Sequence, residues 1–178
     1  IICEDILMQS VADHGFPATI LRPPYVYGPH NKIIQREFSF FARLLHGRQI
    51  IVPGDGLTLF QPVHVDDLAA AFANALGKTQ TVGQIYTVSG PQAITINGYI
   101  ETIGEIVGVT PETLCITDME FHRMVKQFDV AEQDLFPFEW RVSNIYSIAK
   151  AVRDLDWSPK YEMHGGLEMT YAWWKENR

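Results

Sequence analysis

A short apolar run that ends in consecutive prolines constrains this chain more than any other feature. An Ala-Thr-Ile-Leu run is followed at once by Arg22-Pro23-Pro24. Because proline has no backbone N–H to donate to a neighbouring strand, a strand must end near Arg22. The loop beyond it carries Tyr25 and Tyr27. A strand that leads into a stiff loop with polar-tipped aromatic side chains is typical of the ligand-binding edge of an open α/β sheet, although a buried strand with a packed loop would give the same pattern.

Helical and strand patterns alternate along the rest of the chain. Apolar residues recur at helical spacing in residues 1–14, 37–46, 66–76, 95–107, 147–155 and 166–175, with a weaker, polar helix at 120–131. Short apolar or β-branched runs predict strands at 16–21, 50–52, 57–65, 84–88 and 114–116, the third interrupted by Pro62. Asp66 is the predicted N-cap of the helix that follows. Because strands alternate with helices, the predicted class is α/β.

The composition narrows the classes of function. The chain carries a net charge of −7, which disfavours binding to the phosphate backbone of nucleic acids. It has two cysteines without a disulfide pattern and no apolar run that approaches a membrane span, so we expect a cytoplasmic protein without a membrane partner. The six histidines have no partner at metal-ligand spacing, so we expect no metal site.

The first residues predict that the chain is a fragment. It begins without methionine and already in a helical pattern, with Ile2, Ile6 and Val11 on one face and Gly15 after the helix. If half of a sheet is missing, the remaining strands have an unpaired edge and an uncovered apolar face. Such surfaces favour self-association, so we expect a homo-oligomer.

Four motifs in a fixed order resemble the extended short-chain dehydrogenase/reductase family, the NAD-dependent epimerases and dehydratases. They are residues 21–29 (LRPPYVYGP), 54–56 (GDG), 62–69 (PVHVDDLA) and 147–159 (SIAKAVRDLDWSP). Asp156 replaces the glycine that the family has in the last motif, and Asp tolerates the positive φ expected there.

The resemblance implies a fold and an activity. It predicts the C-terminal part of a Rossmann-like parallel sheet together with a smaller α/β substrate-binding domain, over residues 1–178. The Gly-rich site for NAD or NADP and the catalytic Tyr and Lys would lie upstream of Ile1, so no catalytic residue is expected in this chain. The parent protein would be an NAD(P)-dependent epimerase, dehydratase or reductase, an oxidoreductase or isomerase that acts on a nucleotide sugar or a related small molecule.

The same resemblance assigns site residues by position. Pro23 and Pro24 fall where the family's backbone approaches the nicotinamide. The predicted substrate-binding positions are Tyr25, Tyr27, His30, Asn31, Phe60, Gln61 and Arg141. Tyr25 occupies the place of a substrate-contacting Asn, and replacement of Tyr25 or Phe60 is expected to change substrate affinity more than folding.

Two departures from the family pattern keep a second function open. Phe60 and Gln61 stand where the family often has Arg-Asp, and Pro137 falls near a second diphosphate-binding Arg. Neither Phe60 nor Pro137 can make the bidentate bonds that favour arginine for diphosphates, and Arg141 is one candidate to compensate. The alternative is a non-catalytic relative that serves as a binding module for a protein or RNA. A Phe-Pro-Phe turn at 136–138 is similar to that of the family's chloroplast stem-loop RNA-binding branch.

Overall fold

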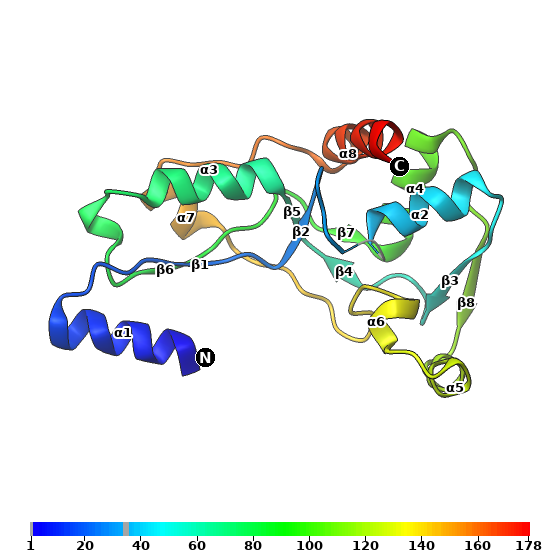
Figure 1. The fold of residues 1–178 in the computed structure, drawn as a ribbon, viewed down its shortest axis with the longest axis horizontal. Helices are drawn as coiled ribbons and strands as arrows, with labels where there is room; N and C mark the ends of the chain where they lie inside the picture. The colour runs from blue at the N-terminus through cyan, green and yellow to red at the C-terminus, as the bar shows by residue number, and fades with distance from the viewer. Residues whose placement is uncertain (1, 34–35) are drawn as a thin grey trace. The chain divides into compact units, whose positions relative to one another are not determined.

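The structure is a computed structural model that describes residues 2–33 and 36–178. It is an α/β structure that divides into two compact units, each built from three separate segments of chain. Unit 1 comprises Ile1–Val26, Gln61–Pro91 and Tyr146–Tyr161, and unit 2 comprises Tyr27–Phe60, Gln92–Ile145 and Glu162–Arg178. Figure 1 shows the elements with the labels used below.

Unit 1 is built around a pair of parallel strands. Its elements are α1 (Ile2–His14), β1 (Ile20–Arg22), β5 (Pro62–His64), α3 (Val65–Ala75), a short 3-10 helix (Thr79–Thr81), β6 (Ile85–Thr87) and α7 (Ala149–Leu155). β1 pairs with β6 from Ile20↔Ile85 to Arg22↔Thr87. β2 (Tyr25–Tyr27), whose first two residues belong to this unit, pairs with β5. The core lies between α3, α7 and these strands, and includes Val63, Ala71, Tyr86, Val88, Ala151, Leu155 and Trp157.

Unit 2 combines helices with two short strand pairs. Its elements are α2 (Glu37–Leu45), β3 (Ile50–Pro53), β4 (Leu59–Phe60), β7 (Ile94–Thr95), α4 (Ile96–Val107), β8 (Thr113–Ile116), α5 (Asp118–Phe128), α6 (Glu132–Leu135) and α8 (Met163–Asn177). β3 and β8 are parallel, whereas β4 and β7 are antiparallel. The core is rich in aromatic side chains, among them Phe40, Phe41, Phe60, Tyr99, Phe121, Phe136, Phe138 and Trp140.

The α/β class and the end of the strand at Arg22 are confirmed, but several predicted boundaries are wrong. The predicted strand at 57–65 is interrupted as expected, but the break falls at Gln61: the run divides into β4 and β5, and Pro62 is the first residue of β5, a position where proline needs no ladder N–H. The N-cap of α3 is His64, whose ring accepts a hydrogen bond from the Asp66 N–H, so Asp66 lies inside the first turn. α5 begins at Asp118 because Thr117 and Glu120 form a capping box, which moves the helix start ahead of the predicted residue 120.

Candidate functional site

In unit 1, β1 and β6 end at the same edge of their pair, and the predicted cofactor-binding residues follow directly. Pro23 is exposed and Pro24 half-buried after the last residue of β1. Both lack a backbone N–H, so this edge presents carbonyl acceptors and no amide donors at these two positions. Arg22 itself is engaged with Glu4 of α1 through a bidentate ion pair, with Nε 2.7 Å from Oε1. These hydrogen bonds from Arg22 lower the pKa of the Glu4 carboxyl.

Gln61 joins two of the three segments of unit 1. Its side-chain N–H donates to the Gly90 carbonyl at 2.8 Å, and its side-chain oxygen accepts from the Tyr146 N–H at 2.8 Å. Ser89 donates to the backbone carbonyl of Gln61 at 2.6 Å. These bonds give Gln61 a role in holding the end of β6. Its contact with substrate stays a prediction.

His64 and Tyr161 form a stacked pair beside two acidic residues of unit 1. Their ring centroids are 4.1 Å apart, and His64 is 1% exposed. Burial lowers the pKa of His64, while Asp66 and Asp67 oppose the shift. Burial also raises the pKa of Tyr161, and the same two carboxylates add to it. The pair therefore favours a neutral imidazole and a protonated phenol.

In unit 2, one turn carries three predicted substrate-binding residues. Tyr27 is buried and packs against Gly166 of α8. His30 has a left-handed backbone (φ 63°), and its ring lies 4.6 Å from that of Trp173. Asn31 shapes the turn, because its side-chain oxygen accepts from the Ile33 N–H at 3.0 Å.

A buried carboxylate that sequence reasoning missed connects this turn to Phe60. Glu37, fully buried at the start of α2, accepts hydrogen bonds from Asn31 at 2.8 Å and from the Tyr99 hydroxyl at 3.4 Å. The Tyr99 ring contacts Phe60, with centroids 5.4 Å apart. The helix start and these donors compensate the buried charge. The only sequence signal for Glu37 was an acid in the first turn of a helix.

Phe60 belongs to the aromatic core of unit 2. It is 7% exposed, and its ring lies 4.8 Å from that of Phe138. Removal of a buried ring costs about 3–5 kcal/mol. Phe60→Ala is therefore expected to disturb folding, contrary to the sequence-based expectation, and Phe60→Leu is the milder test of a substrate role.

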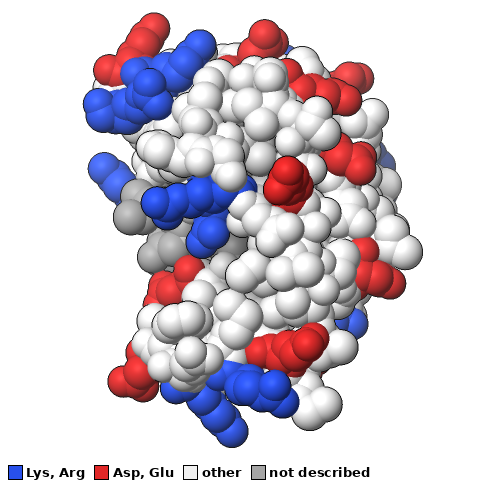
Figure 2. All heavy atoms as spheres, turned by 90° about the vertical axis from the view of Figure 1, so that its right-hand side faces the viewer, with Lys and Arg blue, Asp and Glu red and all other residues white. Residues whose placement is uncertain are grey.

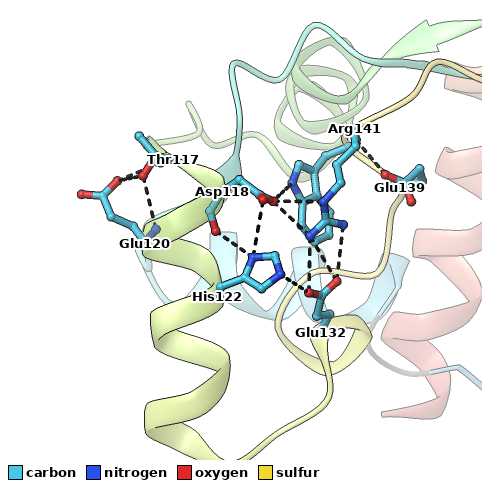
Figure 3. A network of polar contacts seen from close by, with 8 residues as sticks. Thr117, Asp118, Glu120, His122, Glu132, Glu139 and Arg141 are labelled. Carbon is cyan, nitrogen blue, oxygen red and sulfur yellow. Dashed lines mark hydrogen bonds and ion pairs between the residues drawn. The ribbon is translucent and has the colours of Figure 1, made fainter.

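Arg141, the arginine proposed to compensate for the missing family arginines, is already held by other side chains. Its guanidinium lies 3.9 Å above the ring of Trp140, and its Nε donates to Asp118 at 3.0 Å. A second carboxylate, Glu132, accepts from both terminal nitrogens at 3.3 to 3.4 Å. Figure 3 shows the Arg141 side chain facing the carboxylates of Asp118 and Glu132. Arg141 would have to exchange these partners to bind an anionic substrate.

Unit 2 also contains a small, mostly apolar cavity of about 80 Å³. It lies among α2, β3, α5, α6 and the Phe-Pro-Phe turn, and its wall includes Phe40, Arg43, Ile51, Met124, Asp134 and Pro137. Within residues 2–33 and 36–178, no three His, Cys, Asp or Glu side chains come together in a way that could hold a metal ion. Nor does this part of the chain contain a helix with the length and apolar character needed to cross a bilayer.

Comparison with known proteins agrees with this architecture. Parallel strand pairs flanked by helices define the Rossmann-like α/β class, and solved structures of that class superpose on almost all of the chain. UDP-glucuronic acid 4-epimerase from Bacillus cereus matches 98% of this chain and 50% of its own, with a TM-score of 0.78 at 20% identity. dTDP-glucose 4,6-dehydratase from Bacillus anthracis matches 98% of this chain and 50% of its own, with a TM-score of 0.77 at 24% identity.

The family follows from the sequence match. The model of the NAD dependent epimerase/dehydratase family matches residues 1–89. The chain belongs to this family, which lies among the extended short-chain dehydrogenases/reductases, as its motifs predicted.

Two curated relatives illustrate the range of functions in the family. The chloroplast stem-loop binding protein of 41 kDa b from Arabidopsis thaliana is 36% identical over 93% of this chain and 41% of its own length. dTDP-glucose 4,6-dehydratase from an Actinoplanes species is 27% identical over 93% of this chain and 46% of its own. The chain thus spans less than half the length of these relatives.

Proposed function

We propose that this chain is the substrate-binding part of an NAD(P)-dependent epimerase, dehydratase or reductase that acts on a hydroxyl or carbonyl group of a small molecule. The observation that carries the proposal is the family match over residues 1–89, which includes the β1 edge with Pro23 and Pro24. In this proposal the Gly-rich phosphate site and the catalytic Tyr and Lys lie in sequence that precedes Ile1.

The residues present fit one part of a nicotinamide cofactor. The carbonyls of Pro23 and Pro24 are acceptors only, which suits the N–H groups of a carboxamide. They offer nothing to a pyrophosphate, which needs amide donors or cations. A bound cofactor would supply hydride transfer, and this chain would hold its nicotinamide edge and orient the substrate. The two superposed structures described above are complexes with NAD, which favours a nicotinamide cofactor without deciding between NAD and NADP.

We propose that this protein acts on a narrower class of substrates than the enzymes of the family do together. The relatives' names include dTDP-glucose, UDP-glucuronate and GDP-L-fucose enzymes. At the positions where arginine is usual, this chain has Phe60 and Pro137. We therefore propose a substrate recognised by tyrosines, by the polar turn at 27–31 and by apolar side chains, with a smaller contribution from diphosphate binding.

A binding experiment on the full-length protein tests this function. Tyr25→Ala is expected to weaken binding of the substrate found by screening with NAD⁺ and NADP⁺ by roughly tenfold or more, the scale of one lost hydrogen bond plus ring contact. Tyr171→Ala, which removes a tyrosine of α8 outside the predicted set, is the matched control. Unchanged affinity in Tyr25→Ala with intact thermal stability would contradict the site.

A second function is favoured by the 36% identity to a stem-loop binding protein: binding of structured RNA without chemistry. The net charge of −7 weighs against it. On the face drawn in Figure 2, lysine and arginine side chains form separate groups among acidic and uncharged ones instead of a continuous basic band. A filter-binding assay decides: affinity for a stem-loop RNA that falls steeply with salt would support this function, and no binding at low salt would remove it.

A further inference from the structure

A cluster of five side chains ties three segments of unit 2 together, and we call it the clasp. Asp118 and His122 come from α5, Glu132 from α6, and Trp140 and Arg141 from the segment after the Phe-Pro-Phe turn. Arg141 binds both carboxylates, and the Trp140 indole N–H donates to Asp118 at 3.3 Å. In Figure 3 the His122 ring lies between Asp118 and Glu132.

The contacts of His122 favour a proton on both ring nitrogens. Nδ1 lies 2.9 Å from the backbone carbonyl oxygen of Asp118, and Nε2 lies 3.2 Å from a carboxylate oxygen of Glu132. The carbonyl of Asp118 can only accept a hydrogen bond, so Nδ1 carries a proton in this contact. The contact with Glu132 is an ion pair only when Nε2 carries a proton as well, so the imidazolium form satisfies both contacts.

The charges around the ring favour the same form. Asp118 and Glu132 face His122, and both also pair with the guanidinium of Arg141. With His122 protonated, two positive charges meet two negative ones. Further out, Glu139 accepts from the Arg141 N–H at 2.7 Å, and Lys126 lies one turn along α5. Loss of the His122 proton would remove the ion pair with Glu132 and leave two carboxylates sharing the Arg141 guanidinium.

The segments joined by the clasp are also the outer wall of the cavity. Phe121 and Met124 of α5, Leu135 of α6 and the Phe136-Pro137 turn all line it. Because α6 is a single short turn with no buried residue, its own packing holds it weakly. The clasp therefore adds to the hold on this wall, beside the buried rings of Phe121 and Phe136.

We propose that His122 is a protonation-dependent latch: as imidazolium it bridges α5 and α6 and keeps the cavity wall closed, and when it loses a proton α6 and the adjoining turn loosen. The sign follows from the contacts. The bridge is present in the protonated form, so closure is favoured at lower pH and weakened when the ring loses its proton at higher pH. This inference is independent of the function proposed above.

Amide hydrogen exchange of the protein at about pH 5.5 and 8.0, corrected for the intrinsic pH effect, tests the latch. Protection of residues 130–138 relative to α4 is expected to fall roughly three- to tenfold at the higher pH, a modest change because the clasp is partly exposed. His122→Gln is expected to remove this pH difference. Added salt is expected to reduce it, since the partners are charged.

The chain offers a matched control. His46 has the same local contact, with Nδ1 2.7 Å from the carbonyl oxygen of Ala42, but within the described residues no carboxylate forms an ion pair with it. His46→Gln should leave the pH difference intact. The latch is overturned if the difference persists in His122→Gln, or if ¹⁵N spectra at about pH 5.5 show a neutral His122 ring in a folded protein.

Discussion

Trp157 donates its indole N–H to the backbone carbonyl of Asp67 at 2.9 Å, across ninety positions of sequence. The Asp67 side chain completes the connection, because its two oxygens accept from the backbone N–H groups of Lys160 and Tyr161 at 2.9 and 3.1 Å. The first turn of α3 is thereby joined to the segment that follows α7. Asp67 therefore stabilises unit 1 through three bonds.

Asp67→Asn should destabilise the protein by about 1–3 kcal/mol, because the amide group retains one acceptor and turns its N–H₂ toward a backbone donor. Asp66→Asn is the control, since that side chain is exposed and lies in the same helical turn, where its charge is worth about 1 kcal/mol or less. Urea denaturation measures both. Equal costs for the two variants would show that the bonds of Asp67 contribute little.

Replacement of two adjacent glycines of α8 by alanine should change the stability of the protein in opposite directions. At Gly166 a Cβ would lie 2.9 Å from Cζ of buried Tyr27 and closer still to its hydroxyl, so Gly166→Ala should cost about 1–3 kcal/mol. At Gly165 nothing lies within 4 Å, so Gly165→Ala should gain up to about 1 kcal/mol from helix propensity. Thermal unfolding of the Gly165→Ala and Gly166→Ala variants measures the difference in stability. A loss of stability at Gly165 similar to that at Gly166 would contradict the close approach of Tyr27.

The lowered pKa of buried His64 predicts a loss of stability in acid. The unfolded chain, in which histidine titrates near 6.5, binds the proton more readily than the folded one. The free energy of unfolding is therefore highest above about pH 6.5 and falls as pH falls through the lowered folded value.

The variant His64→Asn keeps an acceptor for the Asp66 N–H and does not titrate. Urea denaturation at about pH 7.5 and 5.0 measures the free energy of unfolding at each pH. The decrease from the higher to the lower pH should be smaller for this variant than for the unmodified protein. Parallel losses in the two proteins would mean that another group causes the acid sensitivity.

Unit 1 has surfaces that should make this 178-residue chain self-associate when it is produced alone. Within the described residues β1 pairs only with β6, and Ile2 and Ile6 of α1 are 77% and 63% exposed. Light scattering at increasing concentration should report species larger than a monomer. The double variant Ile2→Lys/Ile6→Lys should shift the distribution toward the monomer, and a monodisperse monomer in the unmodified chain would contradict the prediction.

Local chemistry predicted some details of this structure from sequence. The prolines after Arg22 end β1, and Asp156 has the positive φ expected where the family has glycine (φ 50°). The start of α5 was also within reach, since Thr117 and Glu120 have the spacing of a capping box. For α3, Asp66 was the better capping residue by type, but the buried ring of His64 holds that position.

The polar clusters could not be predicted in this way, because they depend on contacts between distant segments. Glu37 meets the Tyr99 hydroxyl across sixty-two positions, and Arg141 meets Asp118 across twenty-three. Neither pair has a local pattern that distinguishes it from ordinary surface charge. Arg141 was assigned to the substrate site from its position along the chain. That position gave no information about the side chains that Arg141 contacts.

The division of each unit into three segments has a consequence for how the protein is made. A ribosome that has completed residue 145 has not yet supplied the last segment of either unit. Trp157 bonds to Asp67 in unit 1, and Gly166 of α8 lies against Tyr27 in unit 2; both emerge only after residue 145. Neither unit can therefore finish folding before the other has begun, and no single crossover between related genes could exchange one unit intact.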